Sequence, residues 1–271
     1  EGPVTWAGSP GREGVAALIH EHCSTCHRPG QPAPFALLEY EDVRRKRRQI
    51  ARVTASGYMP PWLPSHGEFV GERGLSAAEV ALLGEWVAAG APRGDQREEP
   101  APPEFNPGWQ LGPPDLVLTA QEWVEVSAEG PDVFRNLVLP VEAGSLRFVE
   151  AVEVRPGSPS VHHGVLQVDV TRDARARDAA DLGPGFGGME MGLSTPPDGH
   201  FLGWTPGKGS RRSAPGRAWR LWPGSDLVLQ LHLTPTGKPE RVRPQVGLYF
   251  TDVAPREKPF PLVLRSELLD I

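Results

Sequence analysis

The sequence predicts a multidomain protein of the α plus all-β class, in which a small helical domain is followed by an antiparallel β-sandwich. Residues 1–95 show helical spacing of apolar side chains, whereas residues 115–271 contain short runs rich in β-branched and aromatic residues. Residues 96–114 are rich in Pro, Gly and charge, which is typical of an interdomain linker. The 31 Gly and 31 Pro among 271 residues favour turns and short strands over long helices.

Three helices are expected in the first domain. Gly14–His22 is a short amphipathic run, and Glu41–Ser56 has apolar residues near a helical stripe. The third helix is marked by a capping box that starts at Ser76, because Glu79 stands three residues later, before an apolar run. Gly90 is a typical stop signal for this helix.

The second domain is predicted to contain seven strands separated by turn residues. These strands are Leu116–Leu118, Trp123–Val126, Val133–Pro140, Leu146–Val154, Val161–Val170, Leu227–Leu233 and Val246–Phe250. The stretch Thr171–Gly209, with many Gly, Pro and charged residues, is expected to leave the sheets as a long excursion. An antiparallel sandwich is the simplest fold for this pattern.

Charge and composition exclude several classes of function. A net charge of −6 argues against a nucleic-acid partner. No apolar run approaches the roughly 20 residues that span a bilayer, so no membrane span is expected. The basic run Arg44–Arg48 is either the solvated face of a helix, which we favour, or a docking patch.

Cys23, Cys26 and His27 form a complete C-x-x-C-H motif, which is typical of covalent attachment of a c-type haem. Two thiols one helical turn apart each add to a haem vinyl group, and the following imidazole then ligates the iron. The two Cys are the only ones in the chain, so a zinc site would lack further Cys ligands and no disulfide framework exists. The first domain is therefore predicted to be a cytochrome c domain.

Met59 is the predicted second axial ligand of the haem iron. It is the only Met in the first 188 residues, and it lies in the Pro-stiffened segment Gly57–Trp62. His/Met ligation raises the haem potential, which suits an electron relay. The alternatives are that Met59 only packs in the core and that His66, His20 or His22 binds the iron; His20 and His22 are expected to be surface residues.

Three histidines stand out in the second domain: the adjacent pair His162 and His163, and His232. Adjacent residues of a regular strand point to opposite faces, so spacing alone favours one core and one solvent histidine over a metal site. His200 could approach such a site, but a loop histidine without a metal role is favoured.

The segments around these histidines resemble those of the copper type II, ascorbate-dependent monooxygenases. This family includes peptidylglycine α-hydroxylating monooxygenase and dopamine β-monooxygenase. The similarity spans Asp115 to Asp252 and is carried by four segments: Pro156–Leu166, Phe201–Gly207, Trp219–His232 and Val246–Phe250. It covers the N-terminal β-sandwich of the monooxygenase core. With the haem domain in front, the chain looks like bacterial cytochrome–monooxygenase fusions.

The resemblance implies that His162, His163 and His232 bind one copper, the electron-accepting copper of the family's pair. The adjacent histidines meet this requirement if one of them sits at a β-bulge or coordinates through its other ring nitrogen. The haem would then occupy the place that ascorbate holds in the animal enzymes.

The sequence also departs from the family. The second copper of these enzymes is held by a His-x-His pair and a Met from a second sandwich, and no His follows His232. Met189 and Met191 lie in the wrong region to supply that Met. We therefore expect either the front part of a longer enzyme, with its second-copper domain beyond Ile271, or a protein without that half.

The predicted function is electron transfer from the haem to the three-histidine copper, as the front part of a copper-dependent monooxygenase that hydroxylates C–H bonds. The alternative is a non-catalytic secreted electron-transfer cytochrome with a β-sandwich docking module. The expected partner is a redox protein or a small reductant. Because of the covalent haem, we expect the protein in the periplasm or outside the cell, and we expect the sequence to be the mature form from which a signal peptide has been removed.

Overall fold

The computed structural model describes residues 3–8, 13–29, 31, 33–62, 72–106 and 108–260. The chain divides into two compact units, 1–105 and 106–271. The division falls inside the segment that the sequence predicts as a linker. Among the described residues, no helix is both long and apolar enough to cross a membrane.

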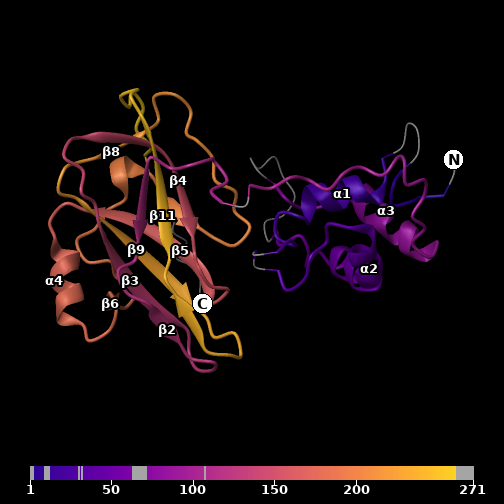
Figure 1. Cartoon of the computed structure of the whole chain (residues 1–271), viewed down its shortest axis with the longest axis horizontal. Helices are drawn as coiled ribbons and strands as arrows, with labels where there is room; N and C mark the ends of the chain where they lie inside the picture. Colours follow the sequence, from indigo (N-terminus) through magenta and orange to yellow (C-terminus); the bar gives the residue numbers. More distant parts are fainter. Residues whose placement is uncertain are drawn as a thin grey trace, which may run out of the picture. The chain divides into compact units, whose positions relative to one another are not determined.

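The N-terminal unit contains three helices, α1 (Val15–His22), α2 (Tyr40–Ala55) and α3 (Ala77–Ala88) (Figure 1). Their bounds agree with the predicted helices to within about two residues. The capping box at the start of α3 is present, because the Ser76 hydroxyl accepts from the Glu79 backbone while the Glu79 carboxylate accepts from the Ser76 backbone. The prediction of this helix start is confirmed.

The core of the helical unit forms where the apolar faces of the three helices meet the N-terminal segment. The Trp6 indole is 1% exposed and lies near the rings of Tyr40 and Trp86. Other buried members are Val4, Val15, Ala16, Leu18, Ile19, Leu37, Val43, Ile50, Leu75, Leu83 and Ala91.

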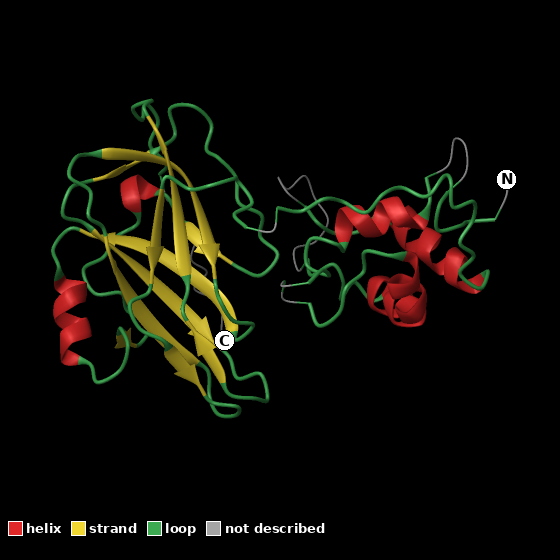
Figure 2. Cartoon of the chain, viewed as in Figure 1, coloured by secondary structure: helices red, strands yellow, loops and turns green. Residues whose placement is uncertain are grey.

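The C-terminal unit is built mainly from antiparallel strands (Figure 2). A four-stranded sheet has the order β1-β11-β4-β8 and a five-stranded sheet the order β6-β3-β9-β5-β7, while β10 and β2 form a separate pair. The strands are β1 (Leu116–Thr119), β2 (Val124–Val126), β3 (Val133–Pro140), β4 (Arg147–Arg155), β5 (Val161–Asp169), β6 (Phe186–Gly187), β7 (Leu202–Trp204), β8 (Trp219–Leu221), β9 (Asp226–Leu233), β10 (Glu240–Val242) and β11 (Gln245–Thr251).

The two larger sheets share one core, as expected for a sandwich. Leu229 and Leu231 of β9 and Leu248 of β11 belong to the same buried cluster and are fully buried. All seven predicted strands are present. The structure adds four short strands and a helix, α4 (Asp173–Ala180), that the sequence pattern did not predict.

The predicted linker packs in part on each unit. The Glu99 carboxylate accepts from the Trp6 indole at 2.8 Å, which attaches the end of the first unit to its core. In the second unit, the Gln110 backbone donates to the buried Glu153 of β4 at 2.8 Å. Trp109 lies so close to Gly247 of β11 that a Cβ on this glycine would come within 3.0 Å of the indole. The segment after Phe105 is therefore part of the β unit.

The segment after β5 does not leave the sheets throughout, as the sequence predicted, because β6 and β7 within it form the two edges of the five-stranded sheet. The segment also folds back over the outer face of the sheet. Phe186 and Met191 of this segment, together with Ala174 of α4, form a small buried cluster with Val138 and Val228 of the sheet. This cover occupies one part of the face, and the candidate metal centre occupies another.

Candidate metal centre

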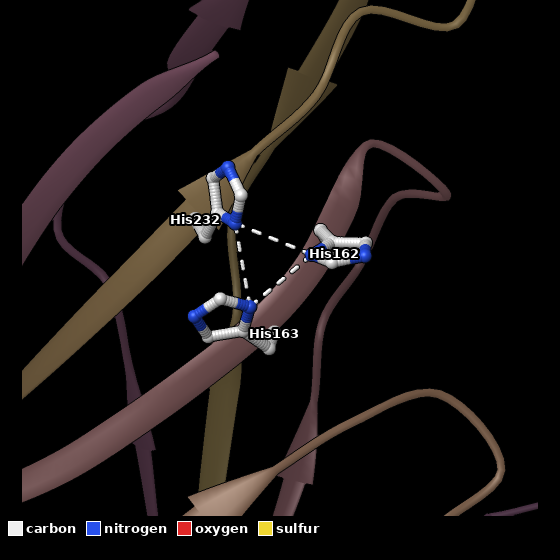
Figure 3. Close-up of side chains that lie close together, drawn as sticks. All are labelled: His162, His163 and His232. Atoms are coloured by element: carbon white, nitrogen blue, oxygen red, sulfur yellow. Dashed lines mark hydrogen bonds between the residues drawn. The ribbon is translucent and has the colours of Figure 1, made fainter. Parts of the chain in front are cut away.

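The three histidines of the second unit converge on a single point. His162 and His163 come from β5 and His232 from the neighbouring β9, and their imidazole rings face one another (Figure 3). The Nδ1 atom of His162 lies 3.2 Å from that of His163 and 3.2 Å from that of His232. The Nδ1 atoms of His163 and His232 are 3.3 Å apart. The three nitrogens thus form a nearly equilateral triangle.

A β-bulge lets two adjacent residues reach the same side of the sheet. In the pairing of β5 with β9, Val161 lies opposite Leu233 and His163 opposite His232, so the register shifts between Val161 and His163. His162 is the extra residue, and the strand bends there. A β-bulge, one of the two arrangements expected to let adjacent histidines serve one site, is therefore present, and all three rings turn the same nitrogen inward.

Hydrogen bonding alone does not satisfy this triangle. A hydrogen bond needs one donor and one acceptor, and each Nδ1 either carries a hydrogen or does not. Of three mutually close nitrogens, at least two are therefore alike, and the contact between those two is repulsive. A cation at the centre would accept all three lone pairs. A point equidistant from the corners lies about 1.9 Å from each nitrogen, close to the ~2.0–2.1 Å of a metal–imidazole bond.

The electrostatic environment of His163 also suits a metal ligand. Burial, reinforced by the nearby His232 and His162, lowers the pKa of His163. The lowered pKa favours the neutral imidazole, which is the form that ligates a metal. Within the described part of the chain, these three residues are the one His, Cys, Asp and Glu group that could hold a metal ion. His200 is not part of it.

Two residues of β3 and the turn before it hold the His232 ring. Its Nε2 donates to the Asp132 carboxylate at 2.8 Å. The Phe134 ring stacks on the imidazole, with centroids 4.4 Å apart and planes 7° apart. Sequence reasoning missed both residues. The sequence shows that Asp132 and Phe134, two residues apart, share one face of a strand. It does not show the register that places this strand beside His232.

In the helical unit, α1 ends at His22, and the C-x-x-C-H segment, residues 23–27, follows as a hydrogen-bonded turn. The His27 backbone donates to the Cys23 carbonyl at 2.9 Å and the Cys26 backbone to the same carbonyl at 3.2 Å. On the imidazole of His27, Nδ1 lies 3.1 Å from the Phe35 carbonyl. A carbonyl only accepts, so Nδ1 carries the hydrogen and Nε2 has a free lone pair.

The thiols of this segment are not poised for thiolate chemistry. Burial, with a smaller contribution from Cys26, raises the pKa of Cys23 to about 12. Burial also raises the pKa of Cys26, against the opposing charges of Arg73 and Arg28. Reactive C-x-x-C pairs have lowered thiol pKa values, so this pair differs from a dithiol redox centre.

Met59 lies in the turn after α2, half-buried, with its backbone donating to the Val53 carbonyl at 3.1 Å. Among the described residues, Met59 belongs neither to the buried cluster of the helical unit nor to the side chains packed against it. The structure therefore gives no support to the alternative that Met59 only packs in the core. No hydrogen bond or ring contact among the described residues joins it to His27. Its role as a haem ligand stays a prediction.

The alternative histidine ligands are placed differently from one another. His20 and His22 are half-buried, so both remain partly at the surface. Nε2 of His20 lies 2.9 Å from the Leu38 carbonyl, while Nε2 of His22 is 3.3 Å from the Glu79 carboxylate. His66 lies outside the described residues.

Comparison with known proteins adds no relative. No protein-family model, no curated protein and no solved structure matches the chain.

Proposed function

We propose that the protein transfers electrons between a covalent haem c in its helical unit and a single type II copper in its β unit. Cys23 and Cys26 would attach the haem, with His27 and Met59 as axial ligands. His162, His163 and His232 would bind the copper. The observation that carries the proposal is the triangle of inward-facing Nδ1 atoms, with sides of 3.2–3.3 Å, held at a β-bulge.

The residues present fit a c-type haem. The Phe35 carbonyl fixes the His27 imidazole with Nε2 free, which is the nitrogen that an iron ligand needs. The turn also brings the two thiols and this imidazole into one short segment of backbone. When bound, the haem would supply a one-electron couple, and a thioether from Met59 would raise its potential.

Three imidazoles fit copper. Imidazole suits copper and zinc, and among divalent ions copper binds such sites most tightly. No Cys contributes to the cluster, so a blue-copper centre is not expected, and oxidised copper would give an ordinary type II signal. A three-imidazole site needs few geometric changes between the two oxidation states of copper, which favours a relay role.

The wider role follows from the resemblance to copper type II monooxygenases. On that basis we propose that the chain serves as the front part of a C–H hydroxylating enzyme, with the haem in place of ascorbate and with a partner domain carrying the second copper. The same proposal places the protein in the periplasm or outside the cell, where a redox protein or a small reductant would supply electrons.

The test is copper analysis and paramagnetic resonance on the full chain, on His163→Ala and on His232→Ala. We expect one copper per chain with nitrogen hyperfine structure, and weaker binding in both variants. His200→Ala is the matched control, since it removes an imidazole from the same unit but outside the triangle, and it should bind copper like the parent. A parent that takes up no copper would refute the copper site and favour a docking role for the sandwich.

A pyridine haemochrome spectrum tests the haem independently. A c-type spectrum with both vinyl groups saturated, retained after acidic acetone extraction, is the expected result. Haem that is extracted by acidic acetone would contradict the attachment through Cys23 and Cys26.

A further inference from the structure

We propose that Asp132 is a positioning residue for the copper centre, which fixes the tautomer and the ring orientation of His232 before any metal binds. The inference rests on the proposed copper site. It adds a residue outside the three ligands and assigns it a measurable effect.

The contact between Asp132 and His232 determines where the imidazole hydrogen is. Nε2 of His232 lies 2.8 Å from Oδ2 of Asp132. An ionised carboxylate has no hydrogen to donate, so the hydrogen of this bond belongs to Nε2. A neutral imidazole carries only one ring hydrogen. In the neutral form of His232, the Nδ1 atom, which points into the triangle, is therefore a bare lone pair available to a metal.

The strand pairing explains why this contact is built into the fold. In the antiparallel pairing of β3 with β9, Phe134 lies directly opposite His232 and Asn136 directly opposite Gln230. Side chains alternate along a strand, so the residue two before Phe134, Asp132, falls on the same face. The Gln230 amide donates to Asn136 at 2.9 Å, and Phe134 stacks on the His232 ring. Three successive residues of this face thus hold two neighbours on β9.

His232 differs in this respect from the other two histidines. Its side chain is 14% exposed and is held on its face by Phe134 and at its outer nitrogen by Asp132. For His162 and His163, the hydrogen bonds of the described residues involve only Nδ1. Among these hydrogen bonds, His232 is therefore the one ring of the three that is held at its outer nitrogen.

Asp132 also adds a negative charge beside the metal position. A carboxylate hydrogen-bonded to the outer nitrogen of a ligating imidazole raises the basicity of the ligand. A negative charge stabilises the doubly charged copper more than the singly charged copper. Removing the charge should therefore weaken Cu(II) binding more than Cu(I) binding, so the copper potential should rise.

The first measurement needs no copper. Nitrogen-15 correlation spectra of the histidine rings, recorded on the metal-free full chain with any haem reduced, report which ring nitrogen carries the hydrogen. We expect the Nε2–H tautomer for His232 in the parent and in Asp132→Asn, whose amide oxygen still accepts, but a mixture of tautomers in Asp132→Ala. Finding Nδ1–H on His232 in the parent would overturn the inference, whatever the chain does with copper.

The second measurement is the affinity of each variant for Cu(II) and Cu(I). We expect Asp132→Ala to lose about 10- to 100-fold in Cu(II) affinity, the range usual for a lost outer partner of a metal-ligating histidine. Asp132→Asn should keep more of the affinity but bind Cu(II) less well relative to Cu(I). Glu129→Ala, which removes an exposed acid from the same turn, is the control and should match the parent.

The outcomes separate the two proposals. A parent that binds copper, with both Asp132 variants unchanged in affinity and potential, refutes the positioning role and leaves the copper site standing. A parent that binds no copper refutes the proposed function, and the tautomer of His232 in the metal-free chain then still decides whether Asp132 sets the ring hydrogen.

Discussion

Replacing Glu153 by Ala should destabilise the C-terminal unit by about 3 kcal/mol. The Glu153 side chain is buried on β4, with the residue 4% exposed, and its carboxylate accepts from the backbones of Gln110 and Leu111. Hydrogen bonds to charged groups contribute about 1.5–3 kcal/mol each, and the bond from Leu111 is the weaker one because it is 3.3 Å long. The Tyr249 hydroxyl keeps a partner in the variant, because it also lies 2.9 Å from the Gly112 carbonyl. The main effect is therefore that the backbone N–H groups of Gln110 and Leu111 lose their acceptor.

Calorimetry measures this loss, because the two units should unfold in separable transitions. A loss of about 3 kcal/mol corresponds to a melting temperature lower by about 6–12 °C for a unit of this size. Amide hydrogen exchange at Gln110 and Leu111 should accelerate in parallel. Glu125→Ala is the control, since its exposed ion pair with Arg241 should contribute less than about 1 kcal/mol. A Glu153→Ala protein that melts like the parent would show that the segment before β1 is not held by this carboxylate.

Three further predictions concern the haem, the pH dependence and the boundary between the units. Met59→Ala should keep the haem attached but lower its potential, because a thioether favours reduced iron; an unchanged spectrum and potential would show that Met59 is not a ligand. Burial and the neighbouring Glu153 raise the pKa of Tyr249 from 10.0 to about 12, so the unfolded state ionises first and stability should fall as the pH rises from 10 to 12. Tyr249→Phe should lack this component in alkaline denaturation. Limited proteolysis should cut near the Phe105–Asn106 junction and release a coloured N-terminal piece, whereas cutting inside β5 would contradict the division.

The long strands and helices could be predicted from the sequence because their buried positions produce a regular spacing of apolar residues. β9 alternates between buried leucines and outward residues, and α3 begins at a complete capping box. α4 was missed because only Ala174 of this helix is buried. It is held instead by contacts distant in sequence: the Arg175 guanidinium pairs with the fully buried Asp226 at 2.5 Å. Such a helix has no apolar stripe for a sequence pattern to detect.

The residues of the candidate sites could be named from the sequence, but the residues that surround the three histidines could not. The C-x-x-C-H motif is local, so the prediction of a haem site needs only five adjacent residues. The three histidines depend on a strand register and on a bulge at His162, and residue spacing alone favoured two different faces for the pair. The contacts of Asp132 and Phe134 with His232 depend on a second register, between β3 and β9, which cannot be read from the types of the residues involved. Contacts of this kind follow from the pairing of strands and not from any one segment.

The position of the histidines on the sheet has a physical reason. The apolar cover provided by the segment after β5 rests on Val138 and Val228 of the five-stranded sheet. The next outward residue of β9 is Gln230, whose amide donates to the Met189 carbonyl at 2.8 Å and to Asn136. These two hydrogen bonds mark the edge of the apolar cover, because here the sheet contacts the loop through polar groups. His232 follows two residues later, beyond the cover, beside the exposed His162. The strand that fills the sandwich core on one face therefore carries on its other face, in this order, an apolar contact at Val228, a hydrogen-bonded amide at Gln230 and a histidine of the candidate metal centre at His232.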